Sequence, residues 1–109
     1  MDNLEPMPES LATLEISTTP DGTALVRIGG ELDMSSVDRL EVQVAPVLAD
    51  LPPRVVVDVG DVRFADSSAI AMWVRWAGAV PEFELRDPPP LLRRVIHTMG
   101  LAGKLGVAE

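Results

Sequence analysis

A valine-rich run that leads into an Asp-Ser-Ser tripeptide constrains the fold of this chain more than any other feature. Residues 54–59 read Arg-Val-Val-Val-Asp-Val, which is typical of a strand covered on both faces in the middle of a sheet. An acidic turn follows, and Asp66, Ser67 and Ser68 then stand at the head of a compact apolar segment. The sequence therefore predicts a buried strand that delivers Ser67 to the start of a helix.

A hairpin is predicted near the start of the chain. Residues 11–18 alternate apolar and polar side chains, and residues 23–28 resume the strand pattern. The turn sequence Pro20-Asp21-Gly22 separates them, with proline presetting one backbone angle and glycine allowing a positive φ. We expect residues 29–33 to follow as a loop.

A helix is predicted after this loop. Ser35 or Ser36 can cap it, and Asp38 stands three residues after Ser35 in capping-box spacing. Pro46 conflicts with the helical pattern, because an interior proline removes a backbone hydrogen bond and clashes with the preceding turn. The sequence therefore predicts a kink or an early stop at this proline.

The remaining elements alternate between helix and strand. Residues 67–77 are predicted to form a helix closed by Gly78, and residues 81–86 include a short strand. A third helix follows three prolines and ends at Gly100, and residues 105–107 form at most a stub of strand. The apolar stripe of the third helix consists of Leu92, Val95, Ile96 and Met99.

This order predicts an α/β fold. A repeat of strand, helix and strand implies parallel neighbours joined by right-handed crossovers. We expect helices to cover one or both faces of a small mixed sheet.

Composition limits the classes of function. The chain has 109 residues, enough for one domain, which we expect at residues 11–109 after a loose acidic tail at residues 1–10. Its net charge of −8 disfavours nucleic acid and anionic membranes as partners. Cysteine is absent, and the sequence shows no secretory signal and no apolar stretch long enough to span a bilayer. We expect a soluble, cytoplasmic protein without membrane insertion.

Ser67 has two interpretations from local pattern alone. A serine at a helix start is explained by capping, because its oxygen can accept an unpaired backbone N–H. The same position can instead present the hydroxyl as a phosphate acceptor, and a phosphate there would stand beside the negative charge of Asp66.

The predicted helix at residues 67–77 offers a second candidate surface. Ile70, Val74 and Ala77 share a face that we expect to meet the sheet. A separate stripe is expected to face outward and to dock a protein partner, since Trp and Met are enriched at interface centres. It consists of Ala69, Met72 and Trp76, with Arg75 nearby. The alternative is that Trp76 folds back over the core or over the edge of the third predicted helix.

Enzymatic and metal sites are weakly indicated. His97 is the only histidine, and no Gly-x-Ser-x-Gly elbow accompanies Ser67. Asp58, Asp61 and Asp66 could gather around a hard cation, but acids that follow a strand are more often solvated. No glycine-rich phosphate loop is present, so no cofactor is expected. Glu31 and Asp33 are expected to line the surface beside Asp66.

From Leu25 to Leu101 the chain resembles the STAS domains of bacterial anti-sigma factor antagonists. The marks of this resemblance, in order, are Gly30-Glu31-Leu32-Asp33, Val55-Val56-Val57-Asp58-Val59, Val62-Arg63-Phe64-Ala65-Asp66-Ser67-Ser68, Leu92-Arg93-Arg94-Val95-Ile96 and Met99-Gly100-Leu101. The resemblance implies a single STAS-like domain, with about four to five strands covered by about three to four helices.

The resemblance also implies a role and a site. The first serine of the Asp-Ser-Ser run, here Ser67, is the residue phosphorylated in this family. The partner is an anti-sigma factor, a serine kinase with a histidine-kinase-like ATPase fold. The unphosphorylated antagonist binds it and frees a sigma factor, the phosphorylated form lets go, and a serine phosphatase resets the cycle. The antagonist itself performs no catalysis. Partner contacts are expected at Glu31, Asp33, Asp66, Ser68, Ala69, Met72, Arg75 and Trp76.

Two departures from the family pattern leave alternatives open. The family usually continues Asp-Ser-Ser-Gly-Leu-Gly, whereas Ala69-Ile70-Ala71 follow here. The chain also ends soon after Leu105, where many relatives carry a further strand and helix, which leaves open whether the sheet edge is finished.

The alternative function is a constitutive, unphosphorylated subunit of a lipid-transporting ABC assembly. A nucleotide-binding sensor is a weaker third interpretation.

Overall fold

The order of strands and helices follows the sequence prediction. The computed structural model describes residues 12–107, so the predicted tail at residues 1–10 lies outside the described residues. The elements in chain order are β1 (Thr13–Thr18), β2 (Ala24–Leu32), α1 (Met34–Ala49), β3 (Arg54–Ala65), α2 (Ser67–Ala79), β4 (Glu82–Arg86) and α3 (Pro90–Thr98).

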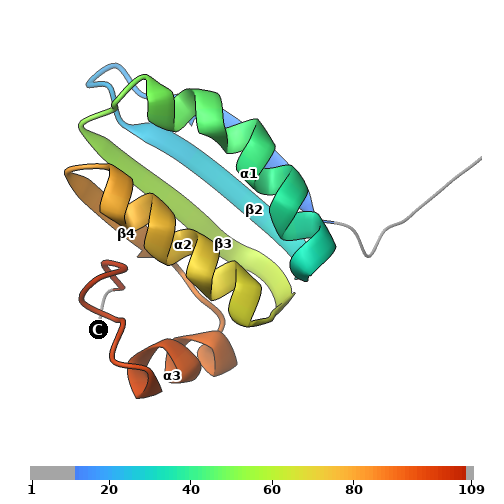
Figure 1. The fold of residues 1–109 in the computed structure, drawn as a ribbon. Coiled ribbons are helices and arrows are strands. Elements are labelled where there is room, and N and C mark those ends of the chain that lie inside the picture. Colours follow the sequence, from blue (N-terminus) through green and yellow to red (C-terminus); the bar gives the residue numbers. More distant parts are fainter. Residues whose placement is uncertain (1–11, 108–109) are drawn as a thin grey trace, which may run out of the picture.

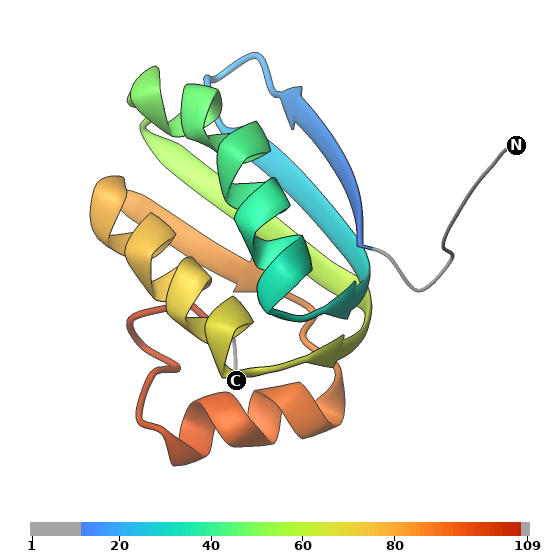
Figure 2. The same cartoon turned by 45° about the vertical axis from the view of Figure 1, so that its right-hand side comes forward.

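The sheet is mixed and its strands stand in sequence order. β1 pairs antiparallel with β2, and the β2–β3 and β3–β4 pairs are parallel, in the order β1-β2-β3-β4. Helices α1 and α2 run side by side over one face, and α3 lies below α2 in both views (Figures 1 and 2). None of the described helices has the length and apolar character needed to cross a bilayer.

β3 is buried on both faces, as its valines predict. Val55 and Val57 point into the main core beneath α1 and α2. Val56 points the opposite way, since side chains alternate along a strand, and is still only 1% exposed. On that side it pairs with Leu25 of β2 and Glu84 of β4. The carboxylate of Glu84 binds Arg54 at 2.6 Å.

β2 and β3 are longer than the sequence predicts. β2 continues through residues 29–32, which were expected to form a loop, and β3 continues past Val59 through the expected acidic turn. The physical reason is mutual pairing. Register shifts between Arg27 and Gly29 and between Gly30 and Glu31 absorb the irregularity, and pairing resumes up to Leu32 and Ala65.

The start and end of α1 also differ from the prediction. Asp33 caps the helix instead of Ser35 or Ser36: its carboxylate accepts both of their backbone N–H groups at 3.1 Å, and its own N–H donates to Ser36 Oγ at 2.9 Å. The reciprocal pair keeps capping-box spacing, shifted to Asp33 and Ser36. An early stop at Pro46 is wrong, because α1 continues to Ala49.

The C-terminal segment closes the free edge of β4. Residues 102–106 form turns, so this segment contains no strand, in line with the prediction of a stub at most. Leu105 nevertheless accepts a backbone hydrogen bond from Leu85 at 2.8 Å. Gly106 lies so close to β4 that an added Cβ would stand 2.2 Å from the Phe83 carbonyl oxygen.

The end of α2 and the packing of α3 also differ from the prediction. Gly78 lies inside α2, which ends at Ala79. The predicted stripe of α3 is only partly buried: Leu92 and Ile96 enter the core, whereas Val95 is 38% and Met99 52% exposed. The contact between α3 and the core is therefore narrow, and one side of the helix is exposed to solvent.

Candidate functional site

The two parallel central strands bring two helix starts to the same edge of the sheet. β2 and β3 end in register at Leu32 and Ala65. Each is followed at once by an aspartate that caps the next helix, Asp33 for α1 and Asp66 for α2. The Asp66 N–H donates to the Leu32 carbonyl at 3.1 Å, which joins the two helix starts directly.

Asp66 and Ser68 cap α2. The Asp66 carboxylate accepts the backbone N–H of Ser68 at 2.9 Å and that of Ala69 at 3.3 Å. It also accepts the Ser68 hydroxyl, so both groups of Ser68 are engaged by the same oxygen. The interpretation of Ser67 as the capping residue is therefore wrong.

Ser67 occupies the first position of α2 and is exposed to solvent. Its hydroxyl takes part in none of the side-chain hydrogen bonds found among residues 12–107. The helix start directs unpaired N–H groups and a partial positive charge towards this end of α2. An exposed and unengaged hydroxyl in this position is chemically suited to accept a phosphoryl group.

The surroundings of Ser67 are acidic. Glu31 stands one residue before the end of β2 and Asp33 caps α1, so both lie at the same end of the sheet as Asp66. Hydrogen bonds from the Ser36 backbone N–H and then the Ser35 hydroxyl hold the pKa of Asp33 below its ordinary value, so it stays ionised. Glu31 lies 3.9 Å from Arg63 across the two strands.

The expected docking stripe on α2 is wrong. Ala69 and Met72 are fully buried and Trp76 is 3% exposed. They share their side of the helix with Trp73, which is also fully buried. Of the residues expected to meet the sheet, Ile70 is buried in the core, whereas Val74 and Ala77 are only half-buried. The reason is that α2 packs against α1 as well as the sheet, so its apolar face is centred between them.

Arg75 lies apart from the strand-end site. It is exposed on the outer side of α2 and binds Glu41 of α1 through two nitrogens, at 2.8 and 3.0 Å. This pair ties the two helices together on their solvent side. Among the described residues, no group of three acidic or histidine side chains is placed to hold a metal ion.

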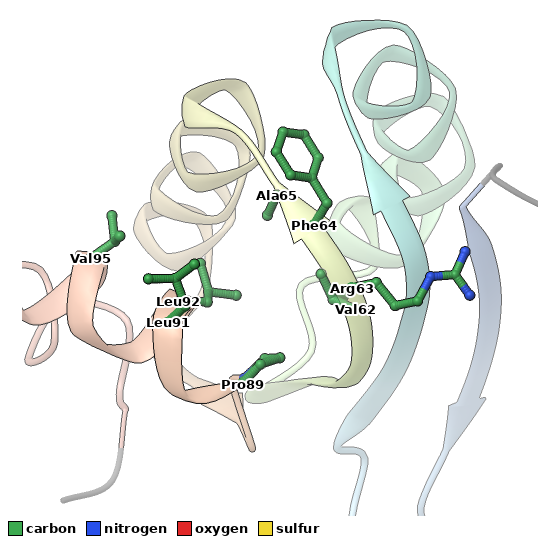
Figure 3. Close-up of a pocket in the computed structure, with 8 residues that line it drawn as sticks. All are labelled: Val62, Arg63, Phe64, Ala65, Pro89, Leu91, Leu92 and Val95. Carbon is green, nitrogen blue, oxygen red and sulfur yellow. The ribbon is translucent and has the colours of Figure 1, made fainter.

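An apolar groove lies close to Ser67, and the sequence did not reveal it. We name it the α3 groove; its volume is ≈ 170 Å³, and its lining consists of Val62, Arg63, Phe64, Ala65, Pro89, Leu91, Leu92 and Val95. The end of β3 forms one wall and α3 the other (Figure 3). The available signal was Leu91, an apolar residue that falls outside the predicted stripe of α3.

Comparison with known proteins defines the class to which this fold and edge belong. A family model described as "Mlab, STAS domain" matches residues 17–107. The anti-sigma-F factor antagonist RsfB, from two strains of Mycobacterium tuberculosis, is 32% identical over 84 residues, which cover 74% of this chain and 69% of that protein. The chain therefore belongs to the STAS domain family of anti-sigma factor antagonists.

Solved structures of antagonists share the fold. An anti-sigma factor antagonist from Mycobacterium paratuberculosis superposes with a TM-score of 0.83 at 27% identity, covering 92% of this chain and 87% of that one. Unphosphorylated SpoIIAA gives a TM-score of 0.75 at 19% identity, covering 89% of each chain. The phosphorylated form of SpoIIAA, a Bacillus cell fate determinant, gives 0.70 at 19% identity and covers 89% of this chain and 92% of that one.

Proposed function

We propose that this chain is an antagonist controlled by phosphorylation of Ser67. In its unphosphorylated form it binds an anti-sigma factor that is also a serine kinase, and a sigma factor is released. The phosphorylated form leaves the anti-sigma factor, and a serine phosphatase restores the hydroxyl. The observation that carries this proposal is the exposed, unengaged hydroxyl of Ser67 beside a cap made by Asp66 and Ser68. Two similar structures add support, since they are of the unphosphorylated and phosphorylated forms of SpoIIAA.

The proposed transfer needs little from the acceptor. Ser67 Oγ forms a bond to the γ-phosphorus of ATP, the bond to the ADP oxygen breaks, and a base of the kinase takes the hydroxyl proton. Magnesium, nucleotide and most of the positioning come from the kinase, as is general for phosphoryl transfer. The antagonist contributes an accessible oxygen at a rigid helix start.

Charge explains the proposed release. A phosphoserine carries roughly −1.5 to −2 charges at neutral pH. At the same sheet edge it would join the carboxylates of Asp66, Asp33 and Glu31. In the kinase active site this doubly charged group would stand beside the phosphates of the bound nucleotide, at a repulsive cost of about 1–5 kcal/mol for charges roughly 6 Å apart at intermediate dielectric. Each 1.4 kcal/mol is about tenfold in affinity.

The proposed contact surface is the strand-end edge. Glu31, Asp33, Asp66 and Ser68 remain proposed partner contacts, and their charge favours a basic surface on the anti-sigma factor. Arg75 remains a proposed contact at the outer side of α2. The side chains of Ala69, Met72 and Trp76 are buried and do not belong to this contact surface. An acidic edge of this kind does not suit nucleic acid, and we propose that the cycle operates in the cytoplasm.

Phosphorylation in vitro tests this proposal. The chain is incubated with its cognate anti-sigma factor and labelled ATP, and incorporation is located by mass spectrometry. We expect one phosphate on Ser67, and none in the Ser67→Ala variant. The matched control is Ser35→Ala, which removes another exposed serine beside a capping aspartate and should leave incorporation intact. Stable binding without incorporation would instead indicate a constitutive interaction subunit.

A further inference from the structure

The α3 groove exposes three large apolar side chains to solvent. Leu91 is 72% exposed, Phe64 54% and Val95 38%, and the three line the same groove. Its volume of ≈ 170 Å³ is below the roughly 300–1,000 Å³ of small-molecule sites. An occupant that inserts one or two apolar side chains therefore fits the groove better than a cofactor.

The α3 wall of the groove belongs to a basic segment of an acidic chain. Residues 90–107 contain Arg93, Arg94 and Lys104 and no Asp or Glu, although the whole chain carries a net charge of −8. Arg94 is exposed and stands three residues after Leu91 on α3, so helical spacing places it on the same side of the helix as this lining residue. The charge of this region favours an occupant that is acidic as well as apolar.

The segment that precedes the described structure has this composition. Residues 1–11 contain no Lys or Arg. Their acidic residues are Asp2, Glu5 and Glu9, and their larger apolar residues are Met1, Leu4, Met7 and Leu11.

The point where this segment joins β1 also lies close enough to the α3 groove for docking. β1 begins at Thr13, which pairs with Gly29, and Gly29 pairs in turn with Asp61, one residue before the groove begins at Val62. Two strand spacings, roughly 10 Å, separate β1 from β3. The eight Cα–Cα steps from Leu4 to Ala12 can span roughly 26 Å when extended. Figure 3 shows Arg63 pointing from the groove over β2 towards β1, along the path between them.

We propose that residues 1–11 dock in the α3 groove, with Leu4 and Met7 against Phe64, Leu91 and Val95 and with the acidic side chains facing Arg94. The docked segment lies beside Phe64, three residues before Ser67. A kinase that covers Ser67 then has to displace the segment, and this last consequence alone rests on the proposed function.

Spin labelling of the full chain tests the docking without any partner. The chain has no cysteine, so Asn3→Cys gives a single attachment point for a nitroxide. The amide signals of Phe64, Leu91 and Val95 should lose most of their intensity with the oxidised label and regain it on reduction. Broadening confined to β1 and the adjacent part of β2 would overturn the proposal.

Charge reversal sharpens the test. Arg94→Glu should remove most of the broadening, and adding Glu5→Lys and Glu9→Lys to that variant should restore it. The matched control is Arg39→Glu, an exposed arginine on α1, which should leave the broadening unchanged. Leu91→Ser gives a second probe: as an exposed position it should keep the fold and lose the broadening. Broadening that survives both groove variants would contradict the docking.

Two further outcomes would assign the groove to another occupant. Spin-labelled chain without isotope is mixed with isotope-labelled chain without the spin label. Broadening of the isotope-labelled chain would identify a second copy as the occupant and overturn docking within one chain. Groove signals that respond only when an anti-sigma factor is added would assign the groove to the partner and overturn it too. Failure of Ser67 phosphorylation would leave the label experiment unaffected.

Discussion

Two neighbouring serines at the start of α2 have different surroundings, and this difference defines the site at the residue scale. Ser68 is held by Asp66 through its backbone and its hydroxyl. Ser67 is exposed and makes no contribution to the cap. The fold therefore does not depend on the hydroxyl that we propose to be modified, which allows its charge to be changed by substitution without loss of structure.

A glutamate at position 67 should separate binding from folding. Ser67→Glu adds a negative charge beside Asp66 and should weaken binding to the anti-sigma factor by about tenfold or more, following the charge repulsion argued above. The same charge lies at a helix N-terminus, where an acid stabilises by about 0.3–1 kcal/mol, so the free energy of unfolding should stay equal or rise. Calorimetric titration and urea unfolding measure the two effects. A drop in both would indicate a distorted site.

Asp33 should make the stability of the domain depend on pH. Its pKa is below the ordinary value of 3.8 in the folded state, because the Ser36 N–H and the Ser35 hydroxyl favour the ionised form. The unfolded chain thus binds the proton first as pH falls. The stabilisation is fully present above pH 3.8 and is lost as pH falls through the lower folded pKa. Urea unfolding at a series of pH values should show a steeper acid loss for the native chain than for Asp33→Asn; parallel curves would contradict this.

For single residues, the sequence predicted where the serine site lies but not which residue caps α2. Asp and Ser both cap helices, so the residue types from Asp66 to Ser68 do not by themselves show that Asp66, and not the expected Ser67, is the cap. The end of β3 decides among them, because Ala65 is the last residue paired with β2 and the following Asp66 takes the capping position. That end depends on register shifts in a strand distant in sequence.

At the scale of elements, α2 is a core helix with a narrow exposed side. Its residues at positions 69, 72, 73 and 76 are buried between the sheet and α1, and its exposed arginine reaches across to α1. Any surface that this helix offers to a partner is consequently confined to its first turn and its outer flank.

Truncating Trp76 should therefore unfold the domain more readily without altering the binding surface. Trp76→Ala should lower the free energy of unfolding by about 3–5 kcal/mol, because it leaves a large cavity. Arg75→Ala is the control on the same helix and should cost no more than about 1 kcal/mol, since it removes an exposed ion pair with Glu41. Urea unfolding followed by circular dichroism measures both. A mild effect at Trp76 with a large loss of partner affinity would support an outward-facing side chain instead.

The element types followed from periodicity and turn residues, but the facing of α2 did not. Helical spacing places Met72 and Trp76 on one stripe and Ile70 and Val74 on another, and both stripes are apolar. Only the packing of α1 against α2 decides which is deeper. The lengths of β2 and β3 escaped prediction for a related reason, because Gly29, Gly30 and Gly60 signal a loop unless a partner strand is known to continue beside them.

On the scale of the whole molecule, the two outer strands of the sheet, β1 and β4, differ in how their free sides are covered. β1 forms one edge and is largely exposed, with Arg27 of β2 facing Glu15 at 3.7 Å beside it. The edge at β4 is covered by the turns at residues 101–107, where Leu105 accepts the Leu85 N–H and Val107 is buried. The sheet edge that the sequence left open is thus finished by a glycine-containing turn.

Gly106 should be the sensitive point of this closure. Its φ of +64° and a carbonyl oxygen 2.2 Å from any added Cβ leave no room for alanine. Gly106→Ala should lower the free energy of unfolding by more than about 1 kcal/mol and increase self-association, since the freed edge of β4 can pair with another chain. Gly103→Ala is the matched control, with no atom within 4 Å of the added Cβ, and should change stability by less than about 0.5 kcal/mol. Unfolding in urea and light scattering report the two effects.

The way the two helices are capped at the ends of β2 and β3 affects how long each copy of the protein can be used. Both helix caps are made by residues other than Ser67. The phosphate that we propose for that oxygen would therefore require no change in either cap. The two forms should then resist proteases equally, so that one copy can serve through many rounds of signalling.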